Sequence, residues 1–289
     1  MIRRYFQPTC IKEFRCDGSK CGAQCCRAGW AIEIDDQTAA AYSSFDAGFN
    51  QHLRFDDELN RHVIALDAEG KCPMLGEDNL CSIQKKYGED FLSETCRQYP
   101  RQTLDFGNYF ERSLSLVCPL AADLILNSER LEFEWFDADE DYHRQSEQFE
   151  SNVPVELRAD FVTLQRTAIA ILQRRSLSIA DRLIELGKYF VQLDPDIALD
   201  ERFFVMSAPS DSRLLENYLV HEFFINAYPW RFPLPTEYNI KIFLSNCKEL
   251  LGREPELTIE GIRQFVTVSN HDMDFIAEQL KTIAFQSTL

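Results

Sequence analysis

The sequence has 289 residues, of which 45% are hydrophobic, and its 30 basic and 47 acidic side chains give a formal net charge of −17. Such a chain can bury one large core or two smaller ones, which disfavours a disordered or repeat protein. The excess of acids repels phosphates, so we expect neither nucleic acid nor anionic membrane as a partner. No apolar run approaches the roughly 20 residues of a transmembrane helix. The start, MIRRYFQPTC, lacks the apolar stretch of a secretory signal, so we expect a cytoplasmic location.

The first part of the chain, residues 1–136, is predicted to be a small irregular α+β domain. HVIALDAEGKCPML, residues 62–75, indicates two brief strands around an Asp-Ala-Glu-Gly turn, and TLDFGNYFERSLSLV, residues 103–117, indicates a hairpin about Gly107 and Asn108. Nine of the ten cysteines lie at or before residue 118. We therefore expect a cysteine-rich metal-binding domain whose loops carry the ligands.

The second part, residues 137–289, is predicted to be a helical domain after an acidic connector at 137–152. Apolar residues recur at three- and four-residue steps, which is the period of an amphipathic helix. The predicted helices cover residues 157–172, 179–190 after Ser178, 212–227, 236–251 and 272–285. The fold class expected for the whole chain is mainly α.

The cysteines begin as CDGSKCGAQCC, residues 16–26, and this cluster contains no histidine. A reducing cytosol favours metal binding or redox chemistry over disulfides. An all-thiolate site suits an iron–sulfur cluster or zinc. Adjacent side chains project in different directions, so Cys25 and Cys26 are not expected to hold one ion together. The metal ligands predicted are Cys16, Cys21, Cys25, Cys26, Cys72, Cys81, Cys96 and Cys118.

The spacing of these eight cysteines leaves their grouping open. They match neither the paired C-x2-C of a zinc ribbon, nor the ferredoxin run, nor a C-x-x-C redox motif. They can form two four-cysteine sites, or one site beside a second group with a redox or packing role. Cys10 and Cys247 are expected to pack as small hydrophobic residues, and His143, His221 and His271 to be structural.

Three segments, FRCDGSKCGAQCCRAGWAIEID, GKCPMLGEDNLCSIQKKYGEDFLSETCRQYPR and SLSLVCP, resemble the flagellin lysine-N-methylases. The amino-terminal part of that family belongs to the wider class of CxxxCC-type zinc- or iron-chelating domains. A weaker likeness continues through AILQRRSLSIADRLIELGKYF and LLENYLVHEFFINAYPWR. The resemblance implies methyl transfer from S-adenosylmethionine to lysine ε-amines of flagellin, with an iron–sulfur cluster of the 4Fe-4S type held by the family's cysteines. The family's cysteine pattern falls here on the eight cysteines named above.

Several residues near the cysteines suit such a cofactor. Trp30 and Tyr99 offer aromatic faces to a sulfonium cation, and Arg97 and Arg101 offer guanidinium groups to a carboxylate. No Gly-rich loop after a strand supports the usual nucleotide-binding methyltransferase fold. The catalytic base is not assigned, although Tyr99, Glu94 and Glu33 lie close to the cysteine motifs.

Two other functions are compatible with the same cysteines. One is a non-catalytic zinc- or iron-binding module that presents a helical surface to a protein partner. The other is a thiol redox sensor that uses Cys25 and Cys26.

Overall fold

The computed structural model describes residues 2–45, 48–139, 149–150, 152–194, 197, 212–232, 234–252 and 257–271. The chain divides into two compact units, each with its own core. We call Phe14–Arg101 the cysteine-rich unit, and Met1–Glu13 with Gln102–Leu289 the helical unit. The predicted boundary lay between residues 136 and 137. The observed division differs, because the first strand of the chain pairs with strands that follow residue 101 and so belongs with the second part of the chain.

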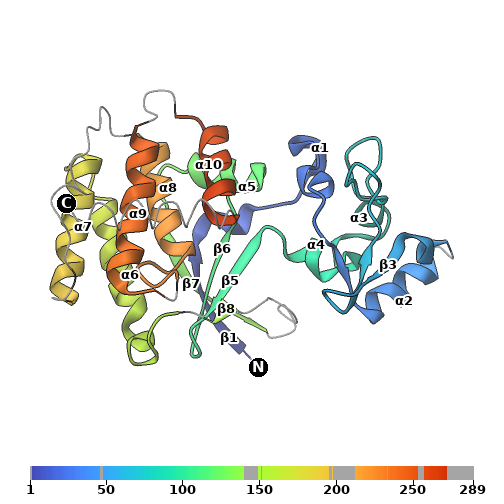
Figure 1. Ribbon diagram of the computed structural model, residues 1–289, viewed down its shortest axis with the longest axis horizontal. Coiled ribbons are helices and arrows are strands. Elements are labelled where there is room, and N and C mark those ends of the chain that lie inside the picture. Colours follow the sequence, from blue (N-terminus) through green and yellow to red (C-terminus); the bar gives the residue numbers. More distant parts are fainter. Residues whose placement is uncertain are drawn as a thin grey trace. The chain divides into compact units, whose positions relative to one another are not determined.

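The cysteine-rich unit combines short helices with a small sheet (Figure 1). Its three strands have the order β2-β4-β3, and both pairings are antiparallel. In chain order its elements are α1 (Gly18–Cys21), η2 (Gln24–Arg27), β2 (Glu33–Ile34), α2 (Asp36–Phe45), η3 (Phe49–His52), β3 (Leu53–Asp56), β4 (Arg61–Ile64), α3 (Ser82–Tyr87), η4 (Glu89–Phe91) and α4 (Glu94–Gln98).

Of the two strands predicted within residues 62–75, only the first forms a strand, as part of β4. The predicted turn is present, because Asp67 Oδ1 accepts the backbone N–H groups of Glu69 and Lys71 and Gly70 has a φ of +77°. After the turn the chain makes only an isolated bridge between Leu75 and Cys81.

The helical unit is built around a five-stranded sheet of order β7-β1-β6-β5-β8. β1 (Ile2–Pro8) lies parallel to β6 (Phe110–Leu114) and antiparallel to β7 (Phe133–Asp139), while β5 (Arg101–Asp105) lies parallel to β8 (Phe149–Glu150). The predicted hairpin about Gly107 is confirmed, since β5 and β6 are neighbours and Gly107 has a φ of +87°. Residues 137–139 and 149–150 of the expected acidic connector are strand instead.

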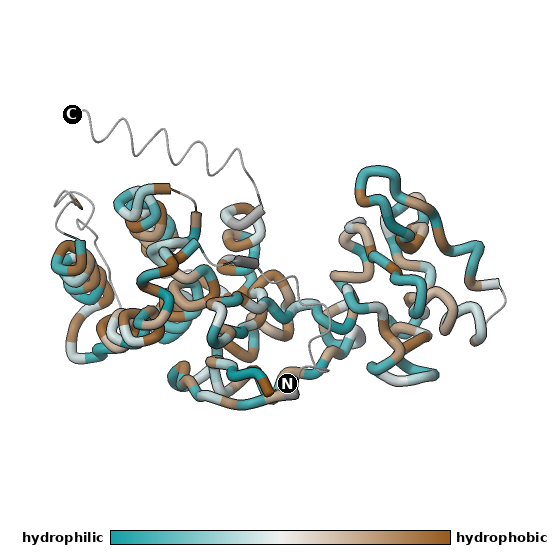
Figure 2. The backbone as a smooth tube through the Cα atoms, turned by 90° about the horizontal axis from the view of Figure 1, so that it is seen from below, coloured by the Kyte–Doolittle hydropathy of each residue, from teal (hydrophilic) through white to brown (hydrophobic). Residues whose placement is uncertain are grey.

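Helices lie beside this sheet, as Figure 1 shows. α8 packs against β6, α5 and α6, and its Phe224 ring contacts Phe6 of β1 and Phe133 of β7. The helical elements of the unit are η1 (Thr9–Glu13), α5 (Pro119–Leu126), η6 (Val155–Leu157), α6 (Arg158–Leu172), α7 (Ile179–Leu193), α8 (Arg213–Ile225), α9 (Thr236–Leu251) and α10 (Ile259–His271). Apolar and polar stretches alternate along the chain in Figure 2, as expected for elements with one buried face.

The mainly α character predicted from the sequence is confirmed. The helices expected at 157–172, 179–190, 212–227 and 236–251 correspond to α6, α7, α8 and α9. α10 was not predicted, and the stretch 272–285 lies outside the described residues. No helix in the described part of the chain is long and apolar enough to cross a bilayer.

Candidate metal centre

Five cysteines of the cysteine-rich unit lie around one small core. That core includes Tyr42, Ile83 and Cys72, which is only 5% exposed, and Cys26, Cys81 and Cys96 pack against it. Cys25 lies next to Cys26 on η2. The thiols therefore come from four separate segments of the chain: η2, the loop before Leu75, the start of α3, and α4.

Backbone hydrogen bonds hold these segments together. The N–H of Cys72 donates to the carbonyl oxygen of Cys26 at 2.9 Å, which joins η2 to the loop after the Asp67 turn. Ser93 is the N-cap of α4, and its Oγ accepts the N–H of Cys96 at 3.4 Å. An N-cap hydroxyl satisfies an otherwise unpaired backbone donor, so Ser93 both starts the helix and places Cys96 in its first turn.

The sulfur atoms of Cys25 and Cys26 are 4.0 Å apart. The two sulfurs therefore lie close together in this structure, and the prediction that these adjacent cysteines do not hold one ion together stays a prediction. The two cysteines lie on η2, a tight 3-10 turn that the chain enters from Ala23 in the left-handed region, at a φ of +52°. The direction of neighbouring side chains in regular helices and strands does not apply to such a turn.

The thiols perturb one another electrostatically. Burial raises the pKa of Cys72 to about 11, and the Cys81 and Cys25 thiols add to the rise. Burial likewise raises the pKa of Cys96 to about 12, with the same kind of contribution from Cys72, Cys81 and Cys25. For Cys25, the hydrogen bond with Cys26 and then burial raise the pKa well above its usual range. Without a cation these thiols stay protonated at neutral pH.

We call Cys25, Cys72, Cys81 and Cys96 the central thiols, because the pKa values of Cys72 and Cys96 are raised by the other thiols of this set. Among the described residues, no group of three or more His, Cys, Asp or Glu side chains already has the geometry of a metal site. The donor chemistry nevertheless fits a thiophilic metal. Cys72 is buried and the other three central thiols are half-buried, and neighbouring thiols that repel one another as anions are groups that a cation would stabilise. Binding would require the sulfurs to move closer together, and metal binding is commonly coupled to such ordering.

The other predicted ligands lie elsewhere. Cys16 is exposed, and the half-buried thiol of Cys21 lies 3.9 Å from the carbonyl oxygen of Gly18, to which it can donate. Cys118 is buried in the helical unit, at the N-cap of α5. Cys247 is buried there as well, as expected for a packing role, and Cys10 is half-buried.

The structure brings the predicted cofactor residues together in two pairs. The Trp30 and Tyr99 rings meet edge to face with centroids 4.7 Å apart, and Trp30 is 37% exposed. Arg101 donates to the carbonyl oxygen of Arg97 at 2.9 Å. Tyr99 directly follows α4, the helix that carries Cys96, so the aromatic pair belongs to the same segment as a central thiol.

The arginines and acids of this region also have structural partners. Arg97 forms an ion pair with Glu94, and Arg101 lies 3.8 Å from Glu89 and over the ring of Phe14. Glu33 pairs with Arg61 at 2.6 Å across the β2-β4 ladder. These contacts fix the positions of the side chains predicted from the sequence as cofactor ligands or bases.

Sequence reasoning missed Tyr42 and Ser93. Both are buried, at 3% and 1% exposure, and both adjoin the central thiols. Tyr42 lies on α2, 30 positions before Cys72, and no local pattern marks it. Ser93 had a readable signal, because a serine three residues before Cys96 and directly before Glu94 is typical of an N-cap.

The helical unit buries titratable groups of its own. Burial raises the pKa of Glu111 to about 8, although Gln165 donates to its carboxyl group at 3.0 Å. Burial lowers the pKa of His221 to about 4, and its Nε2 lies 3.0 Å from the carbonyl oxygen of Leu114 and 3.1 Å from the hydroxyl of Ser113. His221 thus joins α8 to β6, in agreement with the structural role predicted for it.

The fold and the site together define a class: mainly α proteins with a separate unit in which several cysteines gather at one small core. Two curated relatives named Lysine-N-methylase, from Salmonella choleraesuis (strain SC-B67) and Salmonella typhimurium (strain LT2), are each 36% identical over 129 residues, which is 42% of this chain and 32% of theirs. The Flagellar biosynthetic protein FliU of Salmonella muenchen is 35% identical over 129 residues, or 42% of this chain and 76% of that protein.

The chain belongs to the flagellin lysine-N-methylase family. Its match spans about a third of the length of the two relatives named Lysine-N-methylase. No family model matches the sequence, and no solved structure matches it.

Proposed function

We propose that this chain is a cytoplasmic protein-lysine N-methyltransferase that transfers a methyl group from S-adenosylmethionine to lysine ε-amines of flagellin or a similar secreted protein. The names of the relatives supply the reaction class and the flagellar connection. The observation in this chain that supports the proposal is that Cys72, Cys81 and Cys96 gather at one small core, with Cys26 and its neighbour Cys25 beside them. The net charge of −17 favours the approach of a lysine-bearing protein.

The central thiols would hold an iron–sulfur cluster, with zinc as the alternative metal. Four thiolates complete the shell of either centre, and Cys26, 4.0 Å from Cys25, lies within reach as a further donor. A cluster held by only three of these thiolates would keep one iron open to the amino and carboxylate groups of the cofactor.

The aromatic pair of Trp30 and Tyr99 would bind the sulfonium. A cation is attracted to the face of an aromatic ring within about 6 Å of its centroid. Trp30 is partly exposed, which leaves it accessible to a ligand, while the edge-to-face contact with Tyr99 restricts its orientation. The guanidinium groups of Arg97 and Arg101 lie on the same segment and suit the cofactor carboxylate.

The substrate lysine must lose a proton before polar methyl transfer, because its unperturbed pKa is about 10.4. Desolvation of the ammonium group, or a carboxylate that accepts its proton, provides the free amine. Glu94 lies next to the proposed site, where it accepts hydrogen bonds from Arg97 and Gln98. Glu94→Gln is therefore expected to lower methylation while leaving cofactor binding intact.

The test uses the full chain, purified without oxygen. We expect iron and sulfide in the protein, calorimetric binding of S-adenosylmethionine, and incorporation of labelled methyl groups into purified flagellin. Trp30→Ala should weaken cofactor binding about fivefold or more, corresponding to about 1 kcal/mol of cation–π attraction. Phe91→Ala, which removes another exposed ring of the same unit, is the matched control and should leave binding unchanged.

A colourless zinc protein that binds no S-adenosylmethionine would instead support a non-catalytic metal-binding module. The separate core of the cysteine-rich unit is the observation that favours this second function. Protein without bound metal, together with reversible oxidation of Cys25 and Cys26, would support the redox sensor.

A further inference from the structure

Three aromatic rings form a partly exposed cluster on the cysteine-rich unit. Phe45, Tyr87 and Phe91 are the last residues of α2, α3 and η4. The Phe45 and Tyr87 rings stack with their centroids 3.9 Å apart, and the Phe91 ring meets that of Phe45 edge to face at 5.2 Å. We call these three rings the aromatic cluster. It offers ring surfaces in two orientations, because the Phe91 ring is inclined by 68° to that of Phe45.

The local backbone holds the aromatic cluster at the surface. Phe45 and Tyr87 pack against the buried core of the unit, whereas Phe91 is 44% exposed. Gly88 lies between α3 and η4 at a φ of +97°, a conformation that favours glycine. The turn at Gly88 brings Phe91 back against Phe45, and the buried Leu92 anchors the segment that follows. The rings are therefore ordered in advance, and one of them stays accessible to a partner.

A lysine ammonium group already lies over the aromatic cluster. The Nζ atom of the exposed Lys86 is 5.0 Å from the centroid of the Tyr87 ring. Phe45 covers one face of that ring, so the ammonium lies over the other face. An ammonium within about 6 Å of a ring centroid is attracted to the negative face of the ring. This contact within the chain indicates the kind of ligand that the rings accept.

Acidic side chains lie next to the rings. Glu89 and Asp90 occupy the turn that leads into Phe91, and both are exposed. Asp90 forms no ion pair with another residue that the structure describes. The charge of the neighbouring Lys85 is compensated, because its Nζ atom pairs with the carboxylate of Asp78 at 2.5 Å. Charge complementarity therefore favours a cationic partner, in line with the excess of acids in the whole chain.

We propose that the aromatic cluster, together with Glu89 and Asp90, binds a lysine ammonium of the protein substrate, which displaces Lys86 from the Tyr87 ring. Methylation of that lysine keeps its positive charge, and aromatic cages are the usual recognition sites for methylated ammonium groups. The inference rests on the proposed function. It deepens that function by naming a surface that docks a lysine of the substrate other than the reacting one.

The first test uses the full chain and Nα-acetyl-trimethyllysine methylamide as the probe. The aromatic proton–carbon NMR signals of Phe91, assigned by comparison with Phe91→Leu, should shift and saturate as the probe is added. The corresponding acetyllysine compound should shift none of them, because acetylation removes the charge. Equal shifts with the two compounds, or no shift with either, would overturn the ammonium site.

The second test measures calorimetric binding of purified flagellin. Phe91→Leu keeps an apolar side chain but removes the ring, so the Kd should rise about two- to fivefold, the usual size of an exposed cation–π contact. Flagellin with acetylated lysines should bind wild type and Phe91→Leu equally. Reductive methylation of the lysines, which keeps their charge, should preserve the difference between the two proteins.

Phe55→Leu is the matched control. Phe55 is a 49% exposed ring of the same unit that lies on β3, outside the aromatic cluster. This variant should bind unmodified flagellin as tightly as wild type does. Phe91→Leu should in turn bind S-adenosylmethionine as wild type does, which separates the loss of a docking contact from the loss of the fold.

The outcomes separate the cluster from the proposed function. Equal flagellin affinity in Phe91→Leu and wild type would overturn the role of the cluster and leave the proposed function intact. A loss in Phe91→Leu that persists with acetylated flagellin would show an apolar contact and overturn the ammonium site. Wild type that binds the trimethyllysine probe but neither binds nor methylates flagellin would overturn the proposed function and leave the ammonium site standing.

Discussion

Removal of the Glu216 carboxylate tests the energetics of the helical unit. Glu216 lies on α8 and accepts a hydrogen bond from Arg182 at 2.7 Å and bonds from the half-exposed Arg175. The side chains of Arg182 and Glu216 are only 2% and 4% exposed. In Glu216→Ala, Arg182 keeps the carbonyl oxygens of Leu172 and Leu177 but loses its ion pair with this buried carboxylate.

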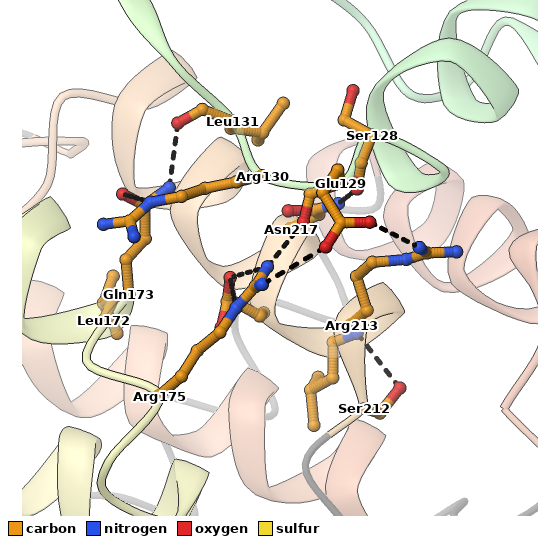
Figure 3. Close-up of polar contacts among 12 residues, drawn as sticks. Ser128, Glu129, Arg130, Leu131, Leu172, Gln173, Arg175, Ser212, Arg213 and Asn217 are labelled. Atoms are coloured by element: carbon orange, nitrogen blue, oxygen red, sulfur yellow. Dashed lines mark hydrogen bonds and ion pairs between the residues drawn. The ribbon is translucent and has the colours of Figure 1, made fainter.

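Removing one partner of a buried ion pair destabilises a protein by about 3–5 kcal/mol, so we expect Glu216→Ala to lower the free energy of unfolding by about 3 kcal/mol. Glu129→Ala is the matched control. Glu129 pairs with Arg175 and Arg213 in the same network (Figure 3). Its side chain, however, is 82% exposed. Exposed ion pairs contribute about 1 kcal/mol or less, and the control should lose no more than that.

The assay is urea unfolding followed by tryptophan fluorescence. A Trp30→Phe background leaves Trp135 and Trp230, both in the helical unit, as the reporters. A loss below about 1 kcal/mol in Glu216→Ala, or an equal loss in Glu129→Ala, would refute the reasoning that burial decides the strength of this network.

Three further predictions concern pH, capping and metal removal. Burial raises the folded-state pKa of Glu111 from 4.5 to about 8, so the protonated carboxyl stabilises the fold at low pH and this contribution is lost as pH rises towards 8. Relative to Glu111→Gln, the wild type should lose up to about 1.4 kcal/mol of unfolding free energy per pH unit between about pH 5 and 8. Parallel pH profiles of the two proteins would contradict this. Ser93→Ala should cost about 1 kcal/mol through the lost cap of α4 and weaken metal binding, whereas Ser82→Ala should leave metal affinity unchanged. Chelation of the metal should expose Phe14–Arg101 to protease before the helical unit, and simultaneous digestion of both units would contradict a metal-held cysteine-rich unit.

The helices of the second half could be predicted because their signals are local. Ser178 and Ser212 accept the N–H groups of Asp181 and Leu215, as expected for N-caps ahead of apolar periodicity. The segment that forms α10 is rich in β-branched residues, which weakens its helical signal although Ile262, Phe265 and Val266 are buried with helical spacing.

The sheet could not be predicted in full, because its pairings join distant segments. Tyr5 of β1 lies opposite Phe110 of β6 and Phe136 of β7. No local pattern indicates which strand will pair with which across more than 100 residues, and this pairing decides where the units divide.

The cysteine composition predicted an all-thiolate site, but not its grouping. Only tertiary structure places Cys72, Cys81 and Cys96 around one tyrosine and leaves Cys16 exposed. The Cys25 and Cys26 sulfurs lie 4.0 Å apart on a turn entered from a left-handed Ala23, a conformation that alanine rarely adopts and that no sequence pattern indicates.

The metal content of anaerobically purified cysteine variants tests the central claim most directly. Single Cys→Ser changes at each central thiol should strongly reduce bound metal, measured by mass spectrometry with quantification of sulfide. The same change at Cys16 or Cys21 should leave metal bound at the wild-type level, because these thiols lie outside the convergent core. Wild-type protein without metal, or an equal loss in Cys16→Ser and Cys96→Ser, would contradict the account.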